Sequence, residues 1–389
     1  MTQPMSRPTY TPGKVPALPP CPTPFSDHIY ATKHGVDLPL RVFPSTSVSA
    51  SASAPSSSDS SSSASGANPY IIWIHGGAFT FGRHTLPNPP LGYHVVSIAY
   101  RLCPHVSLAD MVADCTDAIA WCRTNLPGLV GNMGVGVDVD RFVVAGDSAG
   151  GCLSALLAHK LSPAPRALID VYGPTDLCDL HFDSSAPEIN AEIEPLSGEF
   201  PEDEVVRGVA DRDPSHALAV CPSPFQLLFI PLAQARLENA DPTMQYTSRD
   251  RFQCDMKRYM GTNKILFRTI LHARDDWTQE QYMAHAKKWS PLWLLDGEKT
   301  YPPTYLIHGE EDVIVPLNHS TRMAHKLREM GVDVGEWYEH GGHVFDIKYS
   351  GPEAEGWNAF TEPLIAFVEK HRSGAQTVMV HSIDQTYRH

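Results

Sequence analysis

A serine between glycines, Ser148, stands in surroundings that activate a hydroxyl for nucleophilic attack. The segment Gly146-Asp147-Ser148-Ala149-Gly150 follows a short run of strand-forming residues and opens a run of helix-forming residues. The glycines allow a tight strand-to-helix turn, which holds the serine hydroxyl clear of the sheet. The N-terminus of the following helix favours a developing negative charge there. The pattern predicts that Ser148 is a nucleophile.

A serine hydroxyl needs a base to accept its proton, and the base needs an acidic group that orients it. Both residue types follow later in the chain, each in a loop after a predicted strand. For the acid we prefer Asp312 to its neighbours Glu310 and Glu311. For the base we prefer His343 to His340, because His343 follows a glycine pair and precedes two apolar residues.

Another glycine pair, after a buried strand, predicts where a substrate oxygen would bind. The backbone N–H groups of Gly76, Gly77 and Ala78 can approach such an oxygen, together with the N–H of Ala149 directly after the nucleophile. These four residues form the predicted oxyanion hole. Three neighbouring residues are candidates for contact with the substrate: Phe79, Asp147 and Val344.

Composition excludes several classes of protein. The 389 residues carry a formal net charge of −14 without a cluster of Lys and Arg, which argues against a nucleic-acid-binding surface. No apolar run has the length of a membrane span, and the first 21 residues lack the apolar core of a secretory signal. The eight cysteines have no zinc-ligand spacing. We therefore expect a cytoplasmic protein with reduced thiols, no metal and no cofactor.

Strands and helices alternate along most of the chain, which predicts a mainly parallel sheet of eight strands with helices on both faces. Ligands bind at the carboxyl ends of such strands, where Ser148 is expected. The expected strands are a hairpin over residues 28–43 and residues 70–74, 94–100, 141–146, 167–172, 304–307 and 334–338. The expected helices are residues 108–122, 149–161, 323–330 and 357–368, the last begun anew or kinked at Pro363.

Residues 176–301 interrupt this alternation with helical stretches such as 225–237 and 283–289. They predict a helical cap between strands 6 and 7, or a helical satellite that only packs on the core. The domains expected are a flexible N-terminal arm (1–24), a core (25–175 and 302–371), the cap (176–301) and a C-terminal tail (372–389). The Ser-rich segment 45–66 cannot bury apolar surface, and we expect it to be a disordered loop within the core.

Taken together, the motifs resemble the hormone-sensitive-lipase-like esterases, a group of α/β-hydrolases. The likeness spans roughly residues 25–371 and implies that Ser148, Asp312 and His343 form the triad. Ala78 replaces the third glycine of the family's oxyanion loop; it still donates its N–H, but its methyl group narrows the acyl side. The motifs are His75-Gly76-Gly77-Ala78, Tyr100-Arg101-Leu102, Gly146-Asp147-Ser148-Ala149-Gly150-Gly151, Ser290-Pro291-Leu292 before Pro302-Pro303, His308-Gly309 with Asp312, and His343 with Phe345.

The departures from the family leave the substrate open, because the N-terminal region is short and Pro-rich and the insertion between strands 6 and 7 is long. Our first hypothesis is a serine carboxylesterase that hydrolyses a small or medium ester, with a small-molecule ester as its partner and a homodimer left open. The same triad would serve a deacylase, lactonase or thioesterase of secondary metabolism. A non-catalytic ligand-binding protein of this fold would lack the histidine, which is present as His343. A prolyl-oligopeptidase-type peptidase would need a β-propeller, for which the chain has no repeats.

Overall fold

The computed structural model describes residues 25–45, 67–85, 93–131, 136–183, 197–222, 247–349, 351 and 353–372. The predictions for the arm 1–24, for all but the first residue of the Ser-rich segment, for the helical stretch 225–237 and for the tail after residue 372 lie outside the described residues.

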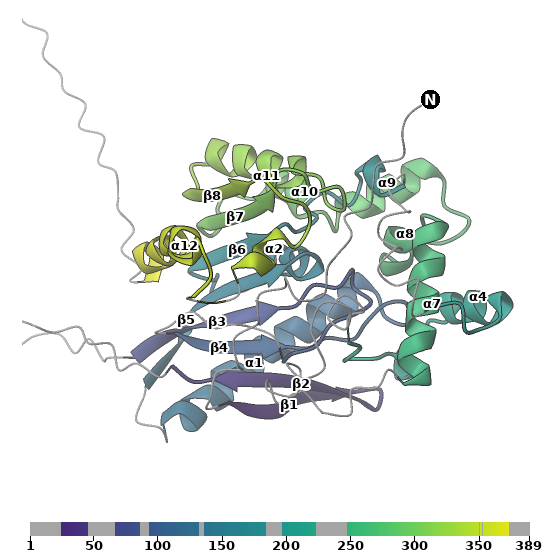
Figure 1. The fold of residues 1–389 in the computed structure, drawn as a ribbon, viewed down its shortest axis with the longest axis horizontal. Coiled ribbons are helices and arrows are strands. Elements are labelled where there is room, and N and C mark those ends of the chain that lie inside the picture. Colours follow the sequence, from purple (N-terminus) through teal and green to yellow (C-terminus); the bar gives the residue numbers. More distant parts are fainter. Residues whose placement is uncertain are drawn as a thin grey trace, which may run out of the picture.

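Eight strands form one sheet in the order β1-β2-β4-β3-β5-β6-β7-β8 (Figure 1). The hairpin β1–β2 pairs antiparallel with β4, and every other neighbouring pair is parallel. This confirms the mainly parallel, eight-stranded sheet predicted from the sequence. The strands are β1 (Ser26–Lys33), β2 (Val36–Phe43), β3 (Ala67–Ile74), β4 (His94–Ile98), β5 (Gly136–Asp147), β6 (Ala167–Val171), β7 (Thr304–Gly309) and β8 (Val334–Glu339).

Helices cover both faces of the sheet. Successive side chains of a strand point to opposite faces, and adjacent residues of β3 accordingly enter different apolar clusters. Ile72 belongs to the same apolar cluster as Met111 of α1 (Leu108–Gly131) and Leu153 of α2 (Ala149–Lys160). Ile71 belongs to the cluster on the other face, which includes Phe367 of α12 (Trp357–Arg372). A further helix, α11 (Asn318–Glu329), packs beside β7 and β8. The central strands are therefore buried on both sides.

Local sequence signals explain where α1 begins and how α12 continues through a proline. At the start of α1, the Asp110 N–H donates to the Ser107 hydroxyl (3.2 Å) and the Ser107 N–H donates to the Asp110 carboxylate (2.9 Å), which satisfies two helix-terminal groups. Of the two alternatives expected at Pro363, a new helix or a kink, the structure excludes the new helix, because α12 continues through the proline. Pro363 is exposed, so the carbonyl that loses its partner lies on the water-facing side of α12.

The chain between β6 and β7 is mainly helical where the structure describes it. Its helices are η1 (Leu180–Asp183), α4 (Glu202–Ala210), η3 (Pro214–His216), α7 (Ser248–Thr262), α8 (Leu266–Ile270), α9 (Gln279–Lys287), α10 (Pro291–Leu294) and η4 (Leu295–Gly297). Figure 1 shows α4, α7, α8 and α9 gathered at one end of the sheet. A backbone pairing of Cys221 with Gly82 ties this insertion to the segment after β3, so that end is the carboxyl end of β3.

Helix α2 approaches β3 so closely that only glycine fits at their contact. A Cβ atom on Gly150 would lie 1.9 Å from the carbonyl oxygen of Ile74, and one on Gly146 would lie 2.4 Å from the carbonyl oxygen of Gly150. Both atoms met are backbone atoms, which no rotamer change can move. The turn between β5 and α2 therefore depends on glycines on both sides of Ser148.

We expect Gly150→Ala to lower the free energy of unfolding by about 3 kcal/mol or more, because α2 must shift away from β3. Urea unfolding followed by circular dichroism measures the change. The control is Gly128→Ala on the exposed side of α1, where a Cβ atom would meet nothing within 4 Å. This control should raise stability by about 0.5–1 kcal/mol. Equal stability of Gly150→Ala and the wild type would contradict the close contact.

Candidate active site

Ser148 occupies the turn between β5 and α2 in a strained backbone conformation. Its φ is 50° and its ψ is −117°, a region that residues with a side chain rarely adopt. The Ser148 N–H donates to the carbonyl of Val171 in the neighbouring strand β6 (2.8 Å), which anchors the turn to the sheet. Strain of this kind persists only where the surroundings enforce it, and here the glycines and the anchor do so.

The structure brings the three predicted residues together in one hydrogen-bonded row. The Oγ atom of Ser148 lies 3.0 Å from Nε2 of His343, and Nδ1 of His343 lies 2.6 Å from Oδ2 of Asp312. The other carboxylate oxygen of Asp312 accepts the N–H groups of Ile314 and Val315, both at 2.9 Å. Asp312 follows β7 and His343 follows β8, so loops at the carboxyl ends of two parallel strands bring both side chains to the end of β5.

The rejected candidates lie elsewhere. Nε2 of His340 is 3.5 Å from Glu311, and the two side chains are 80% and 60% exposed. Glu310 is also exposed. These residues form solvated loop charges, whereas the side chain of Asp312 is fully buried.

A second histidine, His308, contacts the same carboxylate oxygen of Asp312 as His343 does. Its Nε2 lies 2.7 Å from the carbonyl oxygen of Val315 and 3.3 Å from Oδ2 of Asp312, and its Nδ1 lies 2.7 Å from the hydroxyl of Ser320. Two oxygen acceptors around Nε2 place the proton on that atom, so Nδ1 accepts from Ser320. The sequence analysis named His308 in a motif but gave it no role. Its position at a strand end, four residues before Asp312, is the signal from which a contact between the two side chains could have been predicted.

The surroundings keep Asp312 ionised. Burial by itself would raise its pKa, but the hydrogen bonds from His308, His343 and the Val315 N–H outweigh burial and hold the pKa well below the usual range of an aspartate. A carboxylate fixed in this way can orient His343 and stabilise its charged form.

Two further buried carboxyl groups, those of Asp147 and Asp346, lie near Ser148 and His343 and tend to hold a proton. Burial, followed by the charge of Asp346, raises the pKa of Asp147 to about 7, although the N–H of Gly76 donates to its carboxylate. Burial also raises the pKa of Asp346, which accepts the hydroxyl of Tyr172 (2.8 Å). The Tyr172 ring packs against His343, with ring centroids 4.6 Å apart. Sequence reasoning missed Tyr172 and Asp346, and treated Asp147 as a substrate contact.

The predicted oxyanion loop forms a tight, strained turn after β3. Gly77, Ala78 and Phe79 all have positive φ, at 105°, 53° and 62°. The N–H groups of Thr80 and Phe81 donate to the carbonyl of Gly77 (3.0 and 2.9 Å). The carbonyl and N–H of a trans peptide point in opposite directions, so the N–H of Ala78 points out of the turn. Among the described residues, no acceptor takes the N–H of Gly77 or Ala78.

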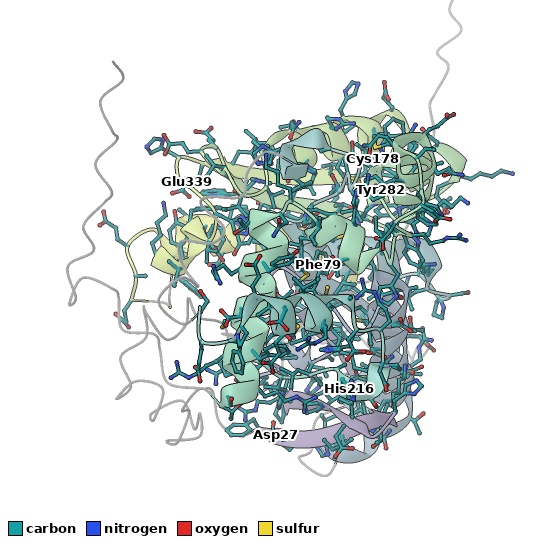
Figure 2. All side chains as sticks on the ribbon, turned by 90° about the vertical axis from the view of Figure 1, so that its right-hand side faces the viewer. Asp27, Phe79, Cys178, His216, Tyr282 and Glu339 are labelled. Atoms are coloured by element: carbon teal, nitrogen blue, oxygen red, sulfur yellow. The ribbon has the colours of Figure 1, made fainter. Side chains whose placement is uncertain are left out.

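Three further predicted residues are Phe79 and Val344, expected to contact the substrate, and Ala149, expected in the oxyanion hole. Phe79 is 1% exposed, with the edge of its ring towards Phe267 of α8, at a centroid distance of 6.5 Å. In Figure 2, which faces the helical insertion, it lies near the centre of the view. Val344 is half-buried directly after His343, and its positive φ of 62° belongs to the turn that brings this histidine back over the sheet. Ala149 is the first residue of α2.

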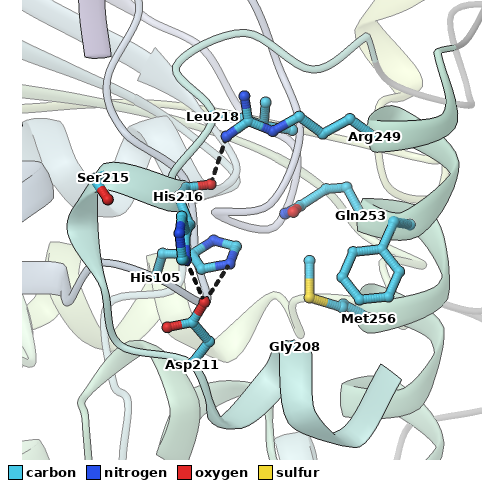
Figure 3. A pocket seen from close by; sticks show the side chains of 10 residues that line it. His105, Gly208, Asp211, Ser215, His216, Leu218, Arg249, Gln253 and Met256 are labelled. Atoms are coloured by element: carbon cyan, nitrogen blue, oxygen red, sulfur yellow. Dashed lines mark hydrogen bonds and ion pairs between the residues drawn. The ribbon is translucent and has the colours of Figure 1, made fainter. Parts of the chain in front are cut away.

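A separate pocket of about 450 Å³ opens beside α7 (Figure 3). Asp211 accepts a hydrogen bond from Nδ1 of His216 (2.7 Å) and lies 3.8 Å from Nε2 of His105. Burial lowers the pKa of His105 to about 4. Ser148, Asp312 and His343 do not line this pocket. Its lining residues are His105, Gly208, Asp211, Ser215, His216, Leu218, Arg249, Phe252, Gln253 and Met256.

In the described parts of the chain, no group of three or more His, Cys, Asp or Glu residues is arranged to hold a metal ion. Among the helices built from those residues, none is both long enough and apolar enough to span a bilayer.

Comparison with known families agrees with the fold. A family described as alpha/beta hydrolase fold matches residues 71–199, and the Prolyl oligopeptidase family matches residues 232–371. The first match contains Ser148 and the oxyanion loop, and the second contains Asp312 and His343. Together with the eight-stranded sheet, these two matches show the α/β-hydrolase fold that the resemblance to the hormone-sensitive-lipase-like esterases predicted.

Solved structures agree with this fold. The chain is similar to an esterase from Pyrobaculum calidifontis, with 18% identity and a TM-score of 0.51, covering 90% of this chain and 86% of that one. It is also similar to Esterase B from Lactobacillus rhamnosis, with 15% identity and a TM-score of 0.51, covering 91% of each chain. At sequence identities this low, the similarity shows a shared fold and nothing more.

Among curated proteins, the chain is similar to parts of fungal synthases. It is 29% identical over 314 residues to the non-reducing polyketide synthase stbA of Stachybotrys bisbyi, covering 77% of this chain and 13% of the synthase. It is 27% identical over 318 residues to methylphloroacetophenone synthase of Cladonia uncialis, covering 76% of this chain and 12% of the synthase. The chain thus corresponds to a small part of each synthase.

We expect Asp147→Asn to alter the pH dependence of stability. The folded-state pKa of Asp147, about 7, lies above the 3.8 of a free aspartate. The carboxyl therefore binds its proton more tightly in the folded protein, and wild-type stability falls as pH rises through this interval. Relative to the wild type, Asp147→Asn should gain roughly 3–4 kcal/mol in unfolding free energy between pH 4 and pH 8. Urea unfolding at both pH values measures this, and parallel pH profiles would contradict it.

Proposed function

We propose that the protein is a serine esterase that hydrolyses a carboxylic ester of small or medium size through an acyl-enzyme on Ser148. The observation that carries the proposal is the row of two hydrogen bonds from Ser148 through His343 to Asp312, at 3.0 and 2.6 Å. An ionised Asp312 fixes the proton of neutral His343 on Nδ1, which leaves Nε2 free to accept the serine proton.

The reaction would proceed in two halves. Nε2 of His343 takes the hydroxyl proton while Oγ of Ser148 attacks the ester carbonyl carbon. The N–H groups of Gly77, Ala78 and Ala149 would bind the oxygen that becomes negative. His343 then gives its proton to the departing alcohol, and the acyl group remains on Ser148. A water molecule, deprotonated by His343, attacks the acyl carbon. The bond to Oγ of Ser148 then breaks, His343 returns the proton to Oγ, and the acid is released.

The Gly76 N–H has a different task in this proposal. It donates to the carboxylate of Asp147, so it is engaged within the protein. The hole would then consist of the N–H groups of Gly77, Ala78 and Ala149. The methyl group of Ala78 would narrow the side of the site that receives the acyl group.

A thioester is the second candidate substrate, and the synthase relatives favour it. One of them is named a polyketide synthase, and the other is named for methylphloroacetophenone, an aromatic compound. Polyketides are assembled as acyl thioesters, and the same attack by Ser148 would release such an acyl group with a thiol as leaving group. Comparing p-nitrophenyl acetate, p-nitrophenyl benzoate and the N-acetylcysteamine thioester of a hydroxybenzoic acid separates the two candidates. A kcat/KM at least tenfold higher for the aromatic thioester than for both esters would favour the second.

We expect Ser148→Ala to lose covalent labelling by a fluorophosphonate probe and to lower kcat by a factor of about 10⁴–10⁶. Asp312→Asn should lower kcat by a factor of about 10⁴, because His343 is then held in the wrong tautomer. Ester hydrolysis and mass spectrometry of the labelled peptide measure both.

The matched control is Ser154→Ala, a buried hydroxyl on the same helix α2. It should keep both labelling and turnover. Wild-type protein that neither labels at Ser148 nor turns over any of the esters or the thioester would overturn the proposal, and would fit a ligand-binding protein of this fold.

A further inference from the structure

One polar side chain of the helical insertion reaches into the loop that carries the proposed oxyanion hole. Gln253 of α7 is 1% exposed. Its Nε2 donates to the carbonyl of Thr80 (3.0 Å) and to the carbonyl of Cys103 (2.6 Å). Both amide protons are thus used, one on the oxyanion loop and one on the segment after β4. Figure 3 shows the Gln253 side chain extending from α7 at the edge of the pocket.

These contacts fix the orientation of two successive peptide groups. In the peptide from Thr80 to Phe81, Gln253 holds the carbonyl, so the N–H points the opposite way and donates to Gly77. In the peptide from Phe79 to Thr80, the carbonyl accepts the Cys103 N–H (2.9 Å), and the N–H also donates to Gly77. Gln253 therefore fastens one peptide directly and the other through Cys103.

Both peptides converge on a single atom, the carbonyl oxygen of Gly77. It accepts the N–H groups of Thr80 and Phe81 and the hydroxyl of Thr80 (3.2 Å). This carbonyl belongs to the same trans peptide as the N–H of Ala78, so fixing the oxygen on one side aims the N–H on the other. Three successive residues with positive φ make the loop costly to hold without such support.

We propose that Gln253 is a positioning residue that aims the Ala78 N–H at the substrate oxygen, acting from α7 through the peptides of residues 79–81. The inference rests on the proposed function, because it assigns a task to the oxyanion hole of that reaction. In this proposal the helical insertion orients the oxyanion loop in addition to packing beside it. Small displacements of such a donor cost much, since a misplacement of 1 Å can reduce a rate by about a hundredfold.

The test replaces Gln253 by Met, which has a similar shape and no N–H donors, and by Asn, which keeps the amide but is one methylene too short to reach both carbonyls. The control is Asp255→Asn on the same helix. Asp255 is buried and accepts the N–H groups of Glu199 and Phe200, both at 3.0 Å, so this change disturbs α7 without a direct contact to the oxyanion loop.

The first readout is the ratio of kcat/KM for an oxygen ester to that for the matching thionoester, whose sulfur is a poor hydrogen-bond acceptor. When the N–H groups of the oxyanion hole point at the substrate oxygen, this ratio is large. We expect kcat for the oxygen ester to fall roughly 10- to 100-fold in Gln253→Met with KM little changed, and the ratio to fall at least tenfold. Gln253→Asn should change both in the same direction, and Asp255→Asn should keep the wild-type ratio.

The second readout is amide hydrogen exchange of residues 79–82 measured by mass spectrometry, which needs no turnover. It should speed up at least tenfold in Gln253→Met and remain as in the wild type in Asp255→Asn. An active wild type whose ratio and exchange are unchanged by both Gln253 substitutions would overturn the inference alone. Wild-type protein without turnover and without labelling at Ser148 would overturn the proposed function, and the catalytic task of Gln253 with it.

Discussion

The backbone turn at Ser148 is the constraint on which the rest of the site depends. A residue with a side chain holds a left-handed φ of 50° there, between a strand and a helix that touch through their glycines. Such a conformation costs on the order of 1–3 kcal/mol. The sheet supports it through the hydrogen bond to Val171 and the contact of Gly150 with β3. The strain directs the hydroxyl towards the end of the sheet, where His343 lies within hydrogen-bond distance.

Electrostatics divide the buried carboxyl groups near this turn into two kinds. Asp312 receives hydrogen bonds from two histidines and from backbone N–H groups, so it stays charged in spite of burial. Asp147 and Asp346 lie near one another, and burial raises the pKa of both. Asp147 and Asp346, which lie close in sequence to Ser148 and His343, thus tend to bind a proton, whereas Asp312 tends to stay ionised. Their environments, rather than their residue type, determine which one can support a histidinium ion.

The sequence predicted the parts of the site that follow from local pattern. Ser148, Asp312 and His343 each come directly after a strand, and parallel strands bring their carboxyl ends to one edge, so topology alone predicted that they meet. Contacts that no strand-end motif marks gave no such signal. The bond from Gln253 to Thr80 spans 173 residues, and the bond from Tyr172 to Asp346 spans 174. The choice between a new helix and a kinked helix at Pro363 stayed open for a different reason, since the sequence does not show that this proline faces water.

The helical insertion and the catalytic loops share one set of buried hydrogen bonds. An insertion that only covered the site would contact the core through apolar side chains, which adapt to small shifts with little change in energy. Gln253 instead uses both protons of a buried amide on backbone carbonyls, and a buried carbonyl without a partner costs about 1–3 kcal/mol. A displacement of α7 large enough to break these bonds would therefore carry an energetic cost and turn the peptide that presents the Ala78 N–H. Through that peptide, changes in the insertion that alter substrate preference would also alter the stabilisation of the oxyanion, which couples recognition to rate.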